Sequence, residues 1–304
     1  MTLKARPHNP LDDPALMARL ISDVTGTPIE LVSKKLRDEF AKPGSTVAAA
    51  FHERNIRPYV AGADMDRFYA DTDAFLYETA IWNRNRAKRQ MRKWVLRHLQ
   101  RYAKSRNRTA LDVLMLGDGM GFDSIRFASA GHQLTYMELP GLQVEFAKRL
   151  FGLAGKHVRM VTDPDLLRGE TFDAVIAIDV LEHVPDPPSL VRTMAAHLRP
   201  GGRLISHAPF YMIHPAYPTH LKNNRRFSGS LSLYTNAGLN LVDGQLFWNP
   251  LVLEKPAEGL TRRAPLRSSL LQLTGLYLRL GRVAAFPFYP IHWYRCARQR
   301  WFGQ

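Results

Sequence analysis

Apolar residues recur at helical spacing through the first 80 residues, and no sheet pattern is evident there. Pro14 to Asp23 and Pro28 to Phe40 each predict an amphipathic helix, and Asp64 to Tyr77 is an acidic piece rich in aromatic residues. Residues 1–80 are therefore expected to form a helical accessory module. It would act either as a lid over an active site or as a packing accessory or oligomer contact.

A basic amphipathic helix is expected next. Its apolar residues follow i, i+3, i+4 spacing at Met91, Trp94, Val95, His98, Leu99 and Tyr102. The basic residues between them are expected on the outward face, with the apolar face packed on the domain.

From Leu111 onward the pattern alternates between strands and helices. Phe172 to Ile178 is an unbroken apolar run, which is typical of a central parallel strand buried on both faces. Further strands are expected at 111–116, 133–138, 157–161, 203–207, 239–247 and 251–255. This alternation predicts an α/β fold with a Rossmann-like, seven-stranded, mostly parallel sheet and helices on both faces. It would occupy residues 81–256, between the helical module and an amphipathic C-terminal segment at 257–304.

A glycine turn follows the first strand and opens the next helix. Gly117, Gly119 and Gly121 let the backbone approach a ligand closely, and the helix start offers unpaired N–H groups. Glu138 ends the second strand, where a carboxylate is placed to accept hydrogen bonds from two ribose hydroxyls. A nucleotide-like ligand is therefore expected at this edge of the sheet.

These pieces, together with Thr162-Asp163, FDAVIAIDVLEHVPDP and LRPGGRLI, resemble the class I S-adenosylmethionine (SAM)-dependent methyltransferases. The similarity is strongest to the group that includes the ubiquinone-pathway O-methyltransferases, and it runs from Leu111 to about Glu254. It implies SAM as the cofactor. By this resemblance the three glycines would line the methionine moiety, Glu138 the ribose, Asp163 the adenine edge, and Asp179 with Val180 the floor beneath the sulfonium.

Two positions depart from that pattern. Met115 stands where the family usually has an acid, and Asp118 stands where it has a small residue. Asp118 is therefore expected to supply the missing charge toward the ammonium group of the cofactor.

The chemistry requires a nucleophile held in line about 3 Å from the methyl group, and a base if that nucleophile is a hydroxyl. His183, Glu182 and His214 are the catalytic candidates. Asp179, Glu182 and His183 form a D-x-x-E-H motif, which resembles the E-x-x-E-H that binds a divalent ion in some O-methyltransferases. His207, His214 or His220 would complete the coordination of a bound Mg²⁺. The alternatives are His183 as a direct base, or a Glu–His pair that only shapes the pocket.

The long aromatic segment 210–227 follows the fifth strand and is expected to build the acceptor pocket. It contains Arg225 and Arg226, which would suit a phosphate, carboxylate or sugar-acid acceptor.

The net charge of +15 arises from two segments of the chain rather than from its whole length. Nineteen of the 42 basic residues lie in two stretches without acids, from Thr79 to Leu111 and after Glu258, so the rest carries 23 basic against 27 acidic residues. The single Cys296 excludes a disulfide framework, and no apolar run is long enough to cross a bilayer. A cytoplasmic protein is expected.

The C-terminal segment mixes leucines, aromatic rings and arginines without acids. This composition fits an anionic membrane surface, which would place the protein peripherally on the inner face of the membrane; it also fits RNA or internal packing. The leading interpretation is a SAM-dependent O-methyltransferase acting on a glycan, a lipid-linked sugar or an amphipathic small molecule. The alternatives are an RNA methyltransferase and a non-catalytic binding protein of the same fold. The sequence leaves open whether the chain forms a homo-oligomer.

Overall fold

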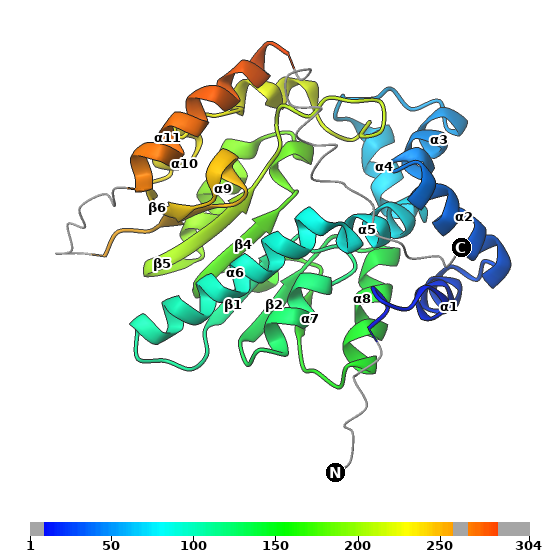
Figure 1. Cartoon of the computed structure of the whole chain (residues 1–304), viewed down its shortest axis with the longest axis horizontal. Coiled ribbons are helices and arrows are strands. Elements are labelled where there is room, and N and C mark those ends of the chain that lie inside the picture. The colour runs from blue at the N-terminus through cyan, green and yellow to red at the C-terminus, as the bar shows by residue number, and fades with distance from the viewer. Residues whose placement is uncertain (1–8, 258–266, 285–304) are drawn as a thin grey trace.

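The computed structural model of the chain describes residues 9–257 and 267–284 (Figure 1). Seven strands form one sheet in the order β3-β2-β1-β4-β5-β7-β6, parallel from β3 to β5, with β7 antiparallel to both of its neighbours. The strands are β1 Asp112–Leu116, β2 Gln133–Met137, β3 Arg159–Val161, β4 Phe172–Ile178, β5 Leu198–His207, β6 Asn240–Gly244 and β7 Leu251–Glu254. The predicted fold class is confirmed.

The fifth strand starts earlier than the sequence predicts. β5 begins at Leu198, which pairs with Phe172, and after an irregularity the pairing resumes between Arg203 and Ala174. The extra residues of the Pro200-Gly201-Gly202 turn are absorbed by this bulge. A segment that reads as a turn in the sequence is therefore part of the strand.

Helices cover both faces of the sheet. Val113 and Met115 of β1 face a core shared with α6 (Arg86–Ser105), α7 (Phe122–Ala128) and α8 (Leu142–Leu153). Leu114 faces the other core, with α9 (Pro187–Ala196), α10 (Ser232–Thr235) and α11 (Arg267–Leu278). All seven residues of β4 are buried, as a central strand requires. The short 3-10 helices are η1 Pro164–Leu167, η2 Leu181–His183, η3 Lys222–Phe227, η4 Leu246–Trp248 and η5 Arg279–Arg282.

The N-terminal region is helical, as expected. It contains α1 (Pro14–Thr25), α2 (Ile29–Ala41), α3 (Ser45–Glu53), α4 (Ala63–Asp71) and α5 (Ala74–Arg84). The acidic aromatic piece splits at Thr72, whose hydroxyl accepts the amide of Ala74 and so ends one helix and starts the next. Figure 1 shows α1 to α4 gathered on one side of the molecule, away from α11. Phe68 packs edge-on against Phe51 and Phe75 and gives α3, α4 and α5 a core of their own.

The basic helix differs from its prediction in one respect. The apolar stripe of α6 is buried, but Lys88 and Arg92 are buried as well, together with Arg84 at the end of α5. Lys88 pairs with Asp123 and Asp179 at 3.3 Å, and Arg92 pairs with Asp123. Because the neighbouring acids need cations, the expectation that the basic residues of this run all face outward is wrong for these side chains. Within the described ranges, no helix combines the length and apolar character that crossing a bilayer requires.

Candidate active site

A cavity of about 630 Å³ opens at the carboxyl ends of the parallel strands, within the size range of small-ligand sites. Its lower wall comes from the segments that follow β1, β2, β4 and β5. Its upper wall comes from the N-terminal helices, with Met65, Tyr69, Glu78, Thr79 and Trp82 among the lining residues. The helical module is therefore part of the site.

The glycine turn leaves bare backbone at this cavity. Gly117 and Gly119 have φ of 70° and 58°, and a Cβ on Gly117 would lie 2.5 Å from Val180. Both residues line the cavity, whereas Gly121 does not. A Cβ on Gly121 would instead lie 2.7 Å from the ring of Phe151, so this glycine allows the turn to pack on α8.

Glu138 lies beside this turn. One carboxylate oxygen accepts the amide of Gly119 at 2.7 Å, the other accepts the amide of Leu139 at 3.0 Å, and burial raises the pKa of the group. The predicted strand-end acid therefore points into the cavity. Asp163 does not: it is exposed, accepts the amide of Asp165 at the start of η1, and is absent from the cavity lining.

Asp118 lines the cavity, but its oxygens have other partners. They accept the amides of Asp123 at 3.2 Å and Ser124 at 2.7 Å, at the start of α7. Burial and the nearby charge of Asp123 raise the pKa of Asp118 to about 7. Because both carboxyl oxygens of Asp118 cap α7, this group is poorly placed to bind an ammonium group in the cavity.

Asp179 adopts a left-handed conformation, with φ of 61°. Its oxygens accept hydrogen bonds from Trp82 Nε1 at 2.8 Å, Lys88 Nζ at 3.3 Å and His207 Nδ1 at 2.6 Å. Burial alone would raise the pKa of Asp179, but Lys88 and His207 outweigh it and hold that pKa far below its usual range. With Val180, this ion-paired carboxylate lines the cavity.

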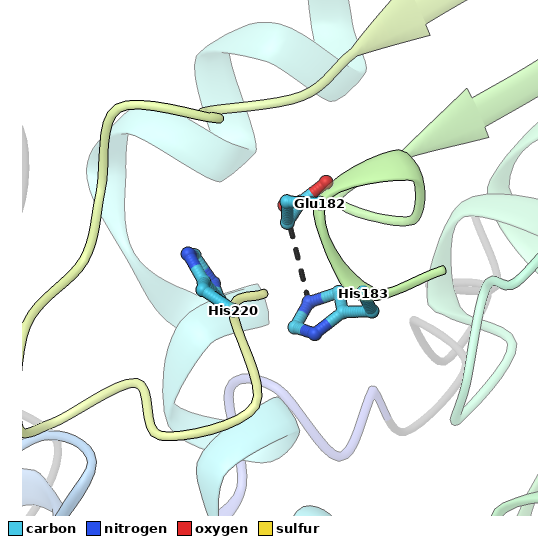
Figure 2. Close-up of side chains that lie close together, drawn as sticks. All are labelled: Glu182, His183 and His220. Atoms are coloured by element: carbon cyan, nitrogen blue, oxygen red, sulfur yellow. Dashed lines mark ion pairs between the residues drawn. The ribbon is translucent and has the colours of Figure 1, made fainter. Parts of the chain in front are cut away.

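The D-x-x-E-H residues do not share one face. Because η2 starts only at Leu181, the side chain of Asp179 turns toward Lys88 and His207, away from Glu182 and His183. His220 takes its place: the ligand atoms of Glu182, His183 and His220 all lie within 4.8 Å of one another. Figure 2 shows the three side chains meeting from two segments of the chain.

Backbone carbonyls orient both imidazoles. His183 Nδ1 lies 3.3 Å from the carbonyl oxygen of Thr219 and 3.1 Å from the hydroxyl of Tyr69, and His220 Nδ1 lies 2.7 Å from the carbonyl oxygen of Met212. Because a carbonyl only accepts, we assign the proton of each ring to Nδ1, which makes Nε2 the unprotonated nitrogen.

Glu182 is an unusual partner for His183. Its oxygens are buried without a hydrogen bond from any described residue, and His183 Nε2 is 3.9 Å away. Burial and the charge of Asp179 raise the pKa of Glu182 well above its usual range. Burial lowers the pKa of His183 to about 4. Burial therefore disfavours the charged form of both neighbouring side chains.

The other predicted residues lie apart from this cluster. His214 lines the cavity and accepts the amide of Ala216, while His207 is bound to Asp179. Arg225 and Arg226 do not line the cavity, and Arg225 donates to the carbonyl of Gly281 beside α11. The expectation of arginines at the acceptor pocket is wrong: η3 turns Arg225 toward the C-terminal segment, and the guanidinium of Arg226 lies over the ring of Phe227.

Tyr69, Glu78 and Trp82 were missed by the sequence analysis. Their only signal is the acidic, aromatic character of the piece that contains α4 and the start of α5. Nothing in that pattern indicates that this piece covers the sheet edge.

A sheet in this strand order, with a ligand cavity at a glycine turn and a strand-end acid beside it, is the arrangement of the class I SAM-dependent methyltransferases. A family profile described as a methyltransferase domain matches residues 73–240, more than half of the chain. The chain belongs to this methyltransferase-domain family, and its cofactor is SAM. The bare backbone of Gly117 and Gly119 and the inward-facing Glu138 fit that cofactor.

The curated relatives include the ubiquinone biosynthesis O-methyltransferase of Xanthomonas oryzae pv. oryzae, 39% identical over 97 residues, which cover 30% of this chain and 40% of that protein. The protein of the same name from Xanthomonas axonopodis pv. citri is 38% identical over the same span. The chain thus matches about 40% of the length of these relatives.

Solved structures with a similar fold include two N-methyltransferases. One is NodS from Bradyrhizobium japonicum with S-adenosyl-L-homocysteine, at 17% identity and a TM-score of 0.43, covering 64% of this chain and 97% of that one. The other is the 1,6-didemethyltoxoflavin-N1-methyltransferase from Burkholderia thailandensis, at 22% identity and a TM-score of 0.45, covering 66% and 94%.

Proposed function

We propose that this protein methylates a hydroxyl oxygen of a small amphipathic acceptor, such as a lipid-linked sugar, a glycan unit or an amphipathic metabolite. The observation that carries the proposal is the cluster of Glu182, His183 and His220 in the same cavity as the glycine turn. SAM supplies an already electrophilic methyl group, so the protein has to position the acceptor and remove its proton. The O-methyltransferase relatives support oxygen as the methylated atom.

We assign the acceptor to the part of the cavity that carries aromatic and apolar side chains, among them Phe75, Trp82, Tyr211, Met212 and Tyr217. Such a surface selects a ligand with an apolar body and one reactive polar end. It does not favour a strongly anionic acceptor, because the lining arginine, Arg84, already donates to the carbonyl of Leu11.

His183 is the proposed base. Its Nε2 is unprotonated at neutral pH because the pKa of the ring is about 4, and Nδ1 is held by the carbonyl of Thr219. The amide of Leu221 and the side-chain amide of Asn224 both donate to the carbonyl of Glu182, which fixes the turn that carries the pair. Glu182 would then position His183 and stabilise the imidazolium as the proton arrives.

The same three side chains support a second role, in binding a divalent ion. Both rings turn Nδ1 to a carbonyl, the second-shell pattern typical of metal-bound histidine, and the orphaned oxygens of Glu182 would gain a partner. Two imidazoles and one carboxylate suit a transition ion better than the Mg²⁺ expected from the sequence. Such an ion would lower the pKa of the acceptor hydroxyl.

One assay tests the proposed function. The full chain would be incubated with isotope-labelled SAM and a panel of amphipathic phenols, lipid-linked sugars and amphipathic amines, with and without EDTA. We expect label in at least one hydroxyl acceptor, whereas transfer to nitrogen only would contradict the proposal. Unchanged turnover in EDTA would assign removal of the acceptor proton to His183. Turnover that is lost in EDTA and restored by Zn²⁺ or Mn²⁺ would assign activation of the hydroxyl to the ion.

Residues 1–80 are proposed to act as the lid of this site, since α4 and α5 supply its upper wall. An RNA substrate is disfavoured by the internal pairing of Lys88 and Arg92. A non-catalytic binding protein would not need an orphaned Glu182 beside an oriented histidine.

The C-terminal region supports a membrane-surface partner. Leu270, Leu273, Leu276 and Leu280 are each 52–60% exposed along one side of α11 and η5, while Leu271 and Leu278 face the core. After Glu258 the chain carries arginines and no acids. We propose that this stripe lies on an anionic lipid surface at the inner face of the membrane of a cytoplasmic protein. The remaining predicted tail, 285–304, lies outside the described residues. A second copy of the chain is the other occupant to test.

A further inference from the structure

Helix α5 passes directly over the glycine turn. The Cγ2 atom of Thr79 lies 3.6 Å from the place a Cβ would take on Gly119. One turn further along, Trp82 Nε1 donates to Asp179 at 2.8 Å. Glu78 lies four residues before Trp82, so both side chains share one face of the helix. Glu78 also lines the cavity. Its carboxyl group therefore faces the space between the glycine turn and Asp179.

Most other acids of this cavity have partners. Glu39 accepts the amide of Thr46, Asp118 caps α7, Glu138 binds the amide of Gly119, and Asp179 binds Trp82, Lys88 and His207. Among the residues that the structure describes, none donates a hydrogen bond to Glu78 or pairs with it. Burial, with the charges of Glu39 and Asp179, raises the pKa of Glu78 to about 8. An unpaired carboxyl group at this place costs free energy until a cation reaches it.

SAM would provide that cation. Its sulfur carries the adenosyl group, the methyl group and the amino-acid chain. With the adenosyl group held at Glu138 and the methyl group facing an acceptor at His183, the glycine turn and α5 would remain as the wall that receives the amino-acid chain. Met115 offers no charge there, and Asp118 is committed to α7.

We infer that Glu78 binds the ammonium group of the amino-acid part of SAM and supplies the carboxylate that the first strand lacks. This inference rests on the SAM-dependent activity proposed above. It makes the N-terminal module a cofactor-binding element as well as a cover. A charge-assisted hydrogen bond also explains why the carboxyl group lies unpaired before the cofactor binds.

Binding of two adenosine ligands tests the inference. S-adenosylhomocysteine carries the amino-acid part, whereas 5′-methylthioadenosine carries the same adenosine and sulfur without it. We expect Glu78→Gln to weaken S-adenosylhomocysteine roughly 10- to 100-fold by calorimetry, and to change 5′-methylthioadenosine less than about twofold. Glu53→Gln is the matched control, since Glu53 is an exposed glutamate of the same module that does not line the cavity. It should change neither affinity.

The melting temperature of the free protein separates binding from folding. Because no residue within 9–257 or 267–284 pairs with Glu78, Glu78→Gln should melt at the wild-type temperature or above it. A clear fall in melting temperature, or equal loss of both ligands, would give the carboxyl group a structural role and overturn the inference. Unchanged affinity for S-adenosylhomocysteine would overturn it as well. If the wild-type chain binds neither ligand, the proposed function fails together with the inference. A wild-type chain that binds both, with a variant that keeps both, refutes the inference alone.

Discussion

Two neighbouring side chains in the cavity have opposite shifts in pKa from the same cause. Burial disfavours the charged form, so it raises the pKa of Glu182 and lowers that of His183. Burial thus favours the neutral form of both groups, in a cavity that would receive a cationic cofactor. The positive charge of the His183 imidazolium would form only when the acceptor hydroxyl gives up its proton.

Replacing His183 tests this arrangement. His183→Ala is expected to lower kcat roughly 10²- to 10⁴-fold, because the loss of a positioned base costs that much. The affinity for S-adenosylhomocysteine, measured by calorimetry, should stay near wild type. Because the pKa of His183 in the free protein is about 4 and the base acts when deprotonated, the wild-type kcat/KM should rise with pH through about 4, not through 6.5.

His214→Ala is the matched control, since His214 lines the same cavity but lies outside the cluster. It should lose less than tenfold in kcat. Near-normal turnover of His183→Ala, or equal losses in the two variants, would remove His183 from the proposed mechanism.

The residues that sequence reasoning found are those set by local spacing. Glu138, Asp179 and Val180 follow directly after strands, so a strand pattern is enough to bring them to the sheet edge. Tyr69 and Trp82 reach the site through contacts that span 114 and 97 residues, for which the sequence holds no periodic signal. His220 belongs with them, because the loop conformation selects it over His207 and His214.

At the scale of elements, a glycine inside the glycine turn can be compared with one outside it. Gly119→Ala should weaken S-adenosylhomocysteine more than tenfold in calorimetry, because the added methyl group points toward Gln143 at the cavity and the backbone is left-handed. The left-handed conformation itself costs about 1–2 kcal/mol with a side chain. Gly131→Ala carries a left-handed strain too, with φ of 96° and open space around the new Cβ. It should lose stability but not affinity, and equal affinity of the two variants would contradict this assignment.

Helices and strands could be predicted from the sequence where a single interaction determined their position. β4 matches its prediction residue for residue because seven consecutive apolar side chains fit a strand buried on both faces. β5 does not, because pairing with β4 and β7 outweighs the turn tendency of Pro200, Gly201 and Gly202. The basic helix α6 was placed correctly, but the demand of Asp123 and Asp179 for buried cations could not be seen in its pattern.

At the scale of the whole molecule, charge and exposed apolar surface concern its partners. Replacing Leu270, Leu273, Leu276 and Leu280 by Gln should reduce binding to phosphatidylserine vesicles at least fivefold in a sedimentation assay, because their apolar area would no longer enter the lipid interface. Neutral phosphatidylcholine vesicles should bind the wild type more weakly.

Leu153 and Leu166 are the control positions, being exposed leucines on other elements. Their replacement by Gln should leave vesicle binding unchanged. If the α11 variant keeps its vesicle binding but changes from dimer to monomer in light scattering, the stripe is an interface between copies.

The division of labour between the two walls of the cavity has a consequence for how such enzymes diversify. The edge of the sheet would bind the cofactor, whereas the N-terminal helices face both the cofactor part and the acceptor part of the cavity. Exchanging residues 9–84 with the matching part of a relative should therefore change the acceptor preference only in part, because Tyr211, Met212 and Tyr217 would stay. Selectivity would then evolve in two segments independently.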